Sequence, residues 1–171
     1  MKASDLLVKE YIPYYMTYIS KVGDLDLIEG LQSSFKTTAS FFEVLPDDKF
    51  EYAYADKKWT VKEIIQHLID AERVFAYRAL RFARGDKNSL PGYDENAYAP
   101  LSLANNRTKE ALLDDYSSLR QSTINLFQSF TDHMLMQIGS ASGGEMSVRA
   151  IGFVIIGHEI HHCEVIKERY L

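Results

Sequence analysis

Residues 147–171, which read SVRAIGFVIIGHEIHHCEVIKERYL, decide how this chain folds. Six of these residues recur at steps of three or four positions: Val148, Ile151, Ile155, His158, His162 and Val165. Such a step is typical of the buried face of an amphipathic helix, and Ser147 is a suitable N-cap for it. The pattern therefore predicts a helix over this stretch, with His158 and His162 one turn apart on its buried face.

Three earlier segments carry the same apolar periodicity, at 24–45, 60–84 and 108–130. Each begins at residues that can cap a helix: Asp24, Thr60 with Glu63 as a capping box, and Thr108. Four amphipathic segments in 171 residues predict an all-α four-helix bundle, forming a single domain over 1–171.

The connecting segments have distinct compositions. Residues 1–22 are rich in tyrosine, which predicts an aromatic segment packed on the bundle or, alternatively, a lid over a pocket. Residues 86–107 form a long connection, which we expect to cross the bundle and to form a wall of any site. Residues 139–144 are expected to form a Gly/Ser turn, and no alternating pattern predicts a strand.

Composition excludes several classes of protein. The formal net charge is -5 and no basic block is present, so we expect neither nucleic acid nor a membrane as a partner. No apolar run reaches the roughly 20 residues of a membrane span. The N-terminus does not resemble a signal peptide and Cys163 has no partner for an internal disulfide, which favours a cytoplasmic location.

The histidines indicate a metal site. Buried imidazoles must satisfy their ring nitrogens, and a shared divalent ion satisfies one nitrogen of each ring. His67 lies on the apolar face of the 60–84 segment, so it can join His158 and His162 across the bundle. Spacing alone would also allow His161 in place of His162, although His161 falls off the buried step. The alternative interpretation is that all three are core histidines that hydrogen-bond within the protein.

Other polar residues are weaker candidates. His133 is expected to be exposed or to cap a helix, and Cys163 to be a packed side chain. Glu159 is expected to be exposed or to support a ligand rather than to bind metal itself. Asp70 and Asp94 could approach the site only through the tertiary fold.

Five segments resemble the DinB-like superfamily, and in particular its branch of metal-dependent hydrolases: 59–63, 67–73, 78–86, 157–162 and 166–171. The resemblance implies an up-down-down-up bundle with a long crossover, and a divalent ion held by His67, His158 and His162. It also implies a homodimer, and it relates the chain to enzymes that transfer low-molecular-weight thiols such as bacillithiol or mycothiol.

Three functions follow. The first is a metal-dependent thiol transferase acting on small electrophiles, with zinc, nickel or iron as the ion and a low-molecular-weight thiol as cosubstrate. The second is a hydrolase using metal-bound water, which requires a nearby base; the lack of a carboxylate on the histidine face favours the first. The third is a non-enzymatic metal-binding module. An enzyme should have its histidines at the floor of a cleft walled by 86–107 and the N-terminal tyrosines, whereas a binding module could have them sealed off.

Overall fold

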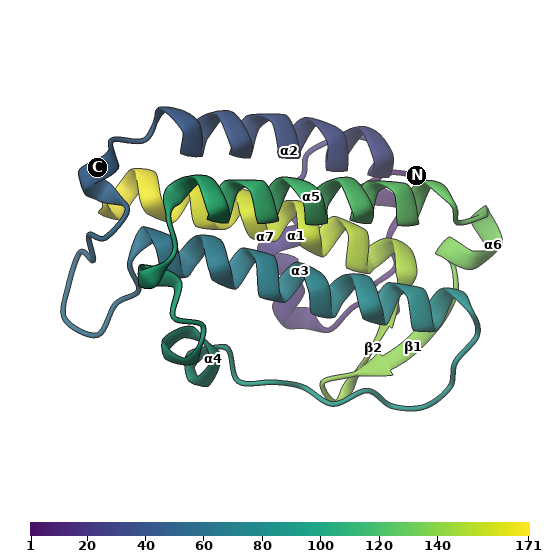
Figure 1. Cartoon of the computed structure of the whole chain (residues 1–171). Helices are drawn as coiled ribbons and strands as arrows, with labels where there is room; N and C mark the ends of the chain where they lie inside the picture. The colour runs from purple at the N-terminus through teal and green to yellow at the C-terminus, as the bar shows by residue number, and fades with distance from the viewer.

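The computed structural model describes residues 1–171, and its framework is a bundle of four long helices (Figure 1). These helices are α2 (Leu27–Val44), α3 (Val61–Ala83), α5 (Lys109–Gln128) and α7 (Val148–Arg169). α5 and α7 each pack against both α2 and α3. α2 and α7 run in one direction and α3 and α5 in the other, so the up-down-down-up arrangement is confirmed (Figure 1).

The helix ends follow local capping chemistry. The Glu63 backbone N–H donates to the Thr60 hydroxyl, and the Glu63 carboxylate accepts from the Thr60 backbone N–H. The Thr108 and Ser147 hydroxyls also accept from the backbone N–H groups three residues later, those of Ala111 and Ala150, but without the reciprocal bond. The expected start at Asp24 is wrong, because α2 begins at Leu27 and Asp24 instead pairs with Lys2 at the surface.

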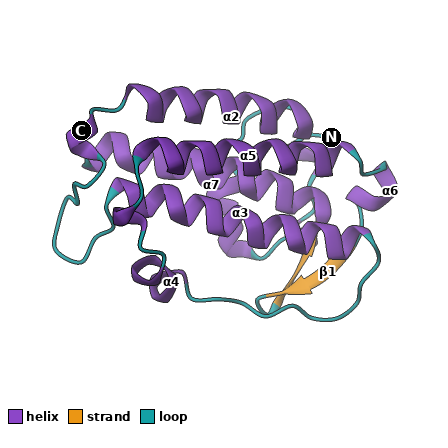
Figure 2. Ribbon diagram, viewed as in Figure 1, coloured by secondary structure: helices purple, strands orange, loops and turns teal.

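The connections contain more structure than the sequence predicts. The 86–107 crossover holds the short helix α4 (Glu95–Leu101) and a 3-10 turn at Ala104–Asn106. After α5 come α6 (Asp132–Leu135) and then an antiparallel hairpin of β1 (Ile138–Ala141) and β2 (Gly144–Ser147), orange in Figure 2.

The hairpin corrects the expectation of a turn without strands. Ser142 and Gly143 both adopt left-handed backbone conformations, with φ of 54° and 81°. Two such residues form a tight hairpin turn that brings the flanking residues into register, with Ile138 opposite Ser147. Strands of four residues are too short for alternation to stand out in the sequence.

The N-terminal segment packs along α7. It consists of 3-10 turns at Ala3–Asp5, Val8–Glu10 and Pro13–Tyr15 followed by the short helix α1 (Met16–Ile19); a further 3-10 turn, Asp47–Lys49, follows α2. Arg149 of α7 donates to the Glu10 carboxylate at 2.5 and 2.7 Å, and both side chains are buried. This ion pair fixes the aromatic segment to the bundle.

We expect the Glu10–Arg149 pair to make the free energy of unfolding decrease as the pH falls into the acid range. Burial alone would raise the pKa of Glu10, but hydrogen bonds from Arg149 and the Leu7 backbone lower it from 4.5 to about 2. The unfolded chain therefore takes up this proton first as the pH falls, and the pair's contribution is lost between about 4.5 and 2. When the pH is lowered from 6 to 3, the shifted pKa of Glu10 should reduce the free energy of unfolding by about 2 kcal/mol.

Urea denaturation at the two pH values measures this effect, with Glu10→Gln as the control. The variant lacks the titrating group, so its loss of stability over the same interval should be about 2 kcal/mol smaller than that of the wild type. Equal losses in the two proteins would show that Glu10 does not contribute.

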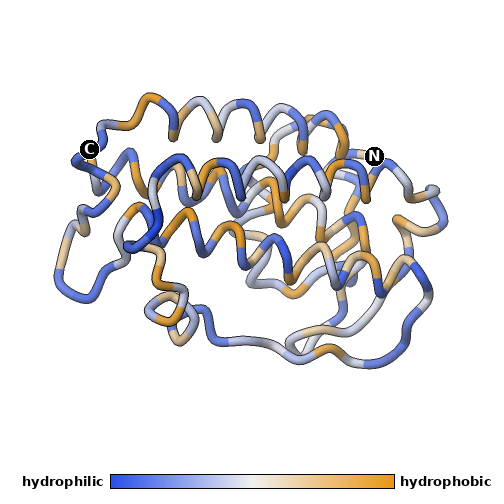
Figure 3. The backbone as a smooth tube through the Cα atoms, viewed as in Figure 1, coloured by the Kyte–Doolittle hydropathy of each residue, from blue (hydrophilic) through white to orange (hydrophobic).

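Apolar side chains fill the space between the helices. The hydropathy colouring shows hydrophobic positions recurring along each bundle helix (Figure 3). Fully buried residues include Leu31 of α2, Ile65 of α3, Leu112 of α5 and Ile151 of α7. None of the helices combines the length and apolar character needed to cross a membrane.

Candidate metal centre

Three histidines from two helices converge inside the bundle. The Nε2 atom of His158 lies 3.0 Å from Nε2 of His67 and 3.1 Å from Nε2 of His162. One ring nitrogen from each of the three residues can serve as a ligand atom, and these three nitrogens lie within 4.8 Å of one another. The structure thus brings together the three residues singled out from the sequence, from positions 91 residues apart in the case of His67 and His158.

The environment keeps these imidazoles neutral. Burial lowers the pKa of His67 from 6.5 to about 4. Burial also lowers the pKa of His158 and of His162 well below the ordinary value, and the neighbouring histidines reinforce that shift. Neutral imidazoles at pH 7 have a nitrogen lone pair available to a metal.

The donor set fits a divalent ion. The His158 Nε2 atom faces two other Nε2 atoms, and a single N–H cannot satisfy both contacts. A cation among the three would accept a lone pair from each ring, and metal–nitrogen bonds of about 2.0–2.1 Å require donor nitrogens only a few ångströms apart. Three histidine ligands leave a coordination position open, as is common at catalytic sites.

Aromatic rings hold the histidines in place. The Trp59 ring lies 4.8 Å from that of His67, and the Tyr18 ring 5.1 Å from that of His158. Tyr18 can come so close because α7 has a glycine there: a Cβ at Gly157 would lie 2.0 Å from the Tyr18 carbonyl oxygen. The absence of a side chain at Gly157 thus permits the close approach of the α1 backbone to α7.

A cleft opens beside two of the histidines. His67 and His158 line a cavity of about 190 Å³ together with N-terminal tyrosines, among them Tyr18, and two residues of the crossover, Tyr93 and Glu95. This is the cleft expected of an enzyme, because its walls are the N-terminal segment and residues from 86–107. The histidines are not sealed off.

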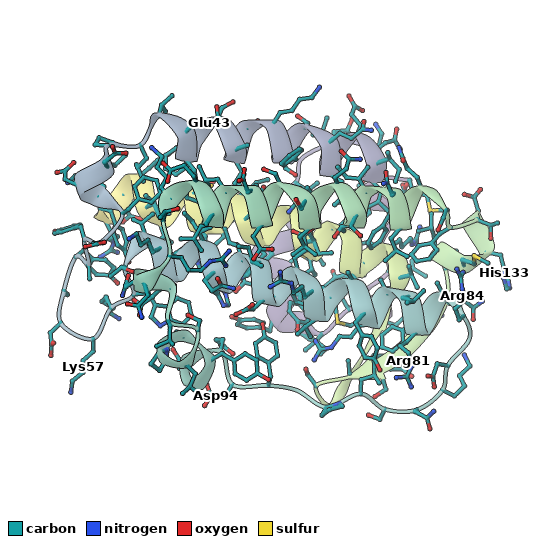
Figure 4. All side chains as sticks on the ribbon, in the orientation of Figure 1. Glu43, Lys57, Arg81, Arg84, Asp94 and His133 are labelled. Atoms are coloured by element: carbon teal, nitrogen blue, oxygen red, sulfur yellow. The ribbon has the colours of Figure 1, made fainter.

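A second cavity reaches the cluster at its third member. His162 lines a space of about 230 Å³ with Trp59, Tyr54 and the exposed Lys57 and Lys58. Lys57 lies on the connector before α3, as labelled in Figure 4. The two cavities share no lining residue, so the histidine cluster is reached from two separate spaces.

A buried ion network lies next to the cluster. Arg120 of α5 donates to Glu72 of α3 at 2.7 Å and to Glu159 of α7 at 2.7 Å, and Tyr116 donates to Glu159 at 2.6 Å. Glu159 is 1% exposed, so its predicted exposed position is wrong, and its carboxylate accepts from Arg120 and Tyr116 rather than from a histidine. Its actual partner, Arg120, is on a helix whose sequence gave no indication of a buried cation.

The remaining sequence candidates lie outside the cluster. His161 is partly buried against Tyr18, with ring centroids 5.5 Å apart. His133 is an exposed residue of α6, at the end of the bundle opposite the C-terminus (Figures 1 and 4). Cys163 is a buried free thiol near Thr38, as expected of a packed side chain.

The carboxylates considered from the sequence have other partners. Asp70 accepts a hydrogen bond from Gln66 and pairs with Arg73, and Asp94 caps α4. The carboxylate that lines the cleft is instead that of Glu95, for which the sequence offered no signal. Arg78 also lines the cleft, and its spacing of eleven residues from His67 could have revealed it, because eleven residues complete about three helical turns.

Comparison with known proteins agrees with this geometry. The family model described as the DinB superfamily matches residues 31–166. Among solved structures, the chain is similar to YfiT from Bacillus subtilis, described as a probable metal-dependent hydrolase with an unusual four-helix bundle topology. The TM-score is 0.72 at 19% identity, over 94% of this chain and 92% of that chain, which is a likeness of fold. No curated protein matches the sequence.

Proposed function

Because the chain belongs to the DinB superfamily and brings three neutral histidines together, we propose that it is a metal-dependent thiol transferase acting on small electrophiles. The observation that carries this proposal is the pair of separate cavities that meet the histidine cluster. A transfer reaction has two organic substrates, and each cavity can hold one of them beside the same centre. Hydrolysis would need only one such space, since water is small.

His67, His158 and His162 would hold the ion. A divalent ion bound there would supply a Lewis acid that lowers the pKa of a thiol or of water at its open position. In the transfer, the thiol would give its proton to solvent and its sulfur would form a bond to the electrophilic carbon. The bond from that carbon to the leaving group would break, and the leaving group would depart with the electron pair. The exposed lysines of the second cavity, Lys57 and Lys58, favour an acidic thiol compound there.

The tyrosines of the cleft can stabilise the departing group. Burial raises the pKa of Tyr18, and the hydrogen bond with Tyr14, at 3.0 Å, raises it further. Burial also raises the pKa of Tyr93 to about 12. These hydroxyls therefore stay protonated at neutral pH and can donate a hydrogen bond to a leaving group that gains negative charge.

One observation favours hydrolysis as the second candidate. Glu95 lines the same cavity as His67 and His158. Its carboxylate can serve as the base that hydrolysis requires, a group that the sequence did not place near the histidines. In that reaction Glu95 would accept the proton of the attacking water. The description of YfiT as a probable hydrolase agrees with this candidate.

A screen of thiols separates the two candidates. Purified protein loaded with zinc or nickel would be mixed with a chromogenic aryl halide and with glutathione, cysteine, bacillithiol or mycothiol. We expect turnover that requires a thiol and gives a thioether, identified by mass spectrometry, and that His67→Ala abolishes.

Two outcomes would contradict the transferase. A product that carries oxygen from water, formed without thiol and lost in Glu95→Gln, would identify a hydrolase. Stoichiometric metal binding without turnover of thiol substrates or of ester and amide substrates would instead leave a non-enzymatic metal-binding module.

A further inference from the structure

Arg78 is a buried cation without a carboxylate partner. Its side chain is on α3, the residue is 2% exposed, and it is absent from every ion pair in the chain. The other two buried arginines each have carboxylate partners: Arg120 pairs with Glu72 and Glu159, and Arg149 with Glu10. An unpaired buried charge is costly, so an anion supplied from outside the chain would be bound strongly there.

The guanidinium is only partly used by the protein. Its Nη2 atom donates to the Pro91 carbonyl and to the Ser142 hydroxyl, each at 2.9 Å. The Tyr15 hydroxyl also interacts with the guanidinium, and no carboxylate of the chain pairs with it. Neither Nε nor Nη1 is sealed from solvent. Because Arg78 lines the cavity that holds His67 and His158, these donors are available to a molecule in that cavity.

The cleft between Arg78 and the histidines has an apolar floor. Ala71 and Phe75 lie between His67 and Arg78 on the same face of α3 and line the same cavity. At about 1.5 Å of rise per residue, the Cα atoms of His67 and Arg78 lie about 16 Å apart. The Phe75 ring bridges the two ends: the Arg78 Cζ atom lies 5.8 Å from its centroid, and the His158 ring lies 6.5 Å from it on centroids.

We propose that Arg78 binds the carboxylate of an elongated substrate whose opposite, reactive end reaches the histidine cluster. This inference rests on the proposed function, and it names the substrate class of the same site. A carboxylate carries one charge and suits a single guanidinium beside the Tyr15 hydroxyl, which belongs to the same cavity. A doubly charged phosphate is disfavoured, because Glu95 also lines the cavity and would repel it more strongly.

The test measures binding of an inert acid and its neutral isostere. Isothermal titration would compare 4-phenylbutanoate with 4-phenylbutanamide as ligands of the wild-type protein. Each ligand would be titrated into two preparations, one loaded with zinc and one stripped of metal by a chelator. We expect the acid to bind about 10- to 100-fold more tightly than the amide, as for hydrogen bonds to a charged partner. The preference should persist without metal, since Arg78 is separate from the histidines. It therefore does not depend on whether the transferase proposal holds.

Matched variants identify the residue responsible. Arg78→Gln should remove the preference and Arg78→Lys should keep part of it, because a cation remains. Arg81→Gln makes the same change of charge one turn further along α3, where Arg81 pairs with Asp86, and should leave the preference unchanged. Circular dichroism establishes that each variant is folded.

Three results would overturn the proposal. They are equal affinity of the wild type for acid and amide, an undiminished preference in Arg78→Gln, and a preference that disappears when the metal is removed. The last would place the carboxylate on the histidine centre. If Arg78→Gln does not fold, Arg78→Lys decides the matter. A weakened preference in that variant supports Arg78 as the anchor, and an undiminished preference overturns the proposal.

Discussion

Replacing His158 with alanine is expected to reduce the divalent metal bound by the purified protein from about one ion per chain to nearly none. His158 is the central member of the cluster, because its Nε2 atom lies within 3.1 Å of the corresponding atom of both His67 and His162. Its removal leaves two ligands and a gap between them. Mutating a residue that hydrogen-bonds to a metal ligand typically lowers metal affinity about 10- to 100-fold. Loss of the ligand itself should therefore lower metal affinity more than about 100-fold.

Metal analysis of dialysed protein, together with zinc titration, measures this loss. His161→Ala is the matched control, because it removes an imidazole from the same helix three residues away but outside the cluster. The control should retain about one ion per chain. Equal metal content in the His158→Ala variant and the wild type would refute the three-histidine centre.

Replacing Arg120 with methionine is expected to lower the free energy of unfolding by about 3–5 kcal/mol. Arg120 is 1% exposed and donates to two carboxylates, Glu72 and Glu159, which are 3% and 1% exposed. Methionine fills much of the same volume but leaves both carboxylates buried without a cation. That uncompensated charge, rather than lost packing, is the reason for the large effect.

Chemical denaturation with a matched surface variant tests this prediction. Arg73→Met removes an arginine that pairs with Asp115, but its side chain is 49% exposed, so the cost should be below about 1 kcal/mol. Similar small losses in both variants would mean that the buried network contributes little. Because Glu72 is on α3 and Glu159 on α7, the Arg120 variant should also loosen the histidine cluster and weaken zinc binding.

Much of the fold follows from local sequence. Thr60, Thr108 and Ser147 start their helices by hydrogen bonds to residues three positions later, and such contacts depend only on the neighbouring chain. The step of three and four positions places His158 and His162 on one face for the same reason. The short hairpin was missed because its turn depends on two left-handed residues, one of which is a serine.

What the sequence by itself determined is therefore the set of four helices, their buried faces and the histidines that lie on them, because helical periodicity is a property of the backbone. Only the tertiary structure decided which buried polar residues meet. Arg120 and Arg78 both lie on buried helix faces, yet one is paired with two carboxylates and the other opens into a cleft. Their partners come from other helices, the crossover and the hairpin, and the distances between such segments are set by packing rather than by spacing along the chain.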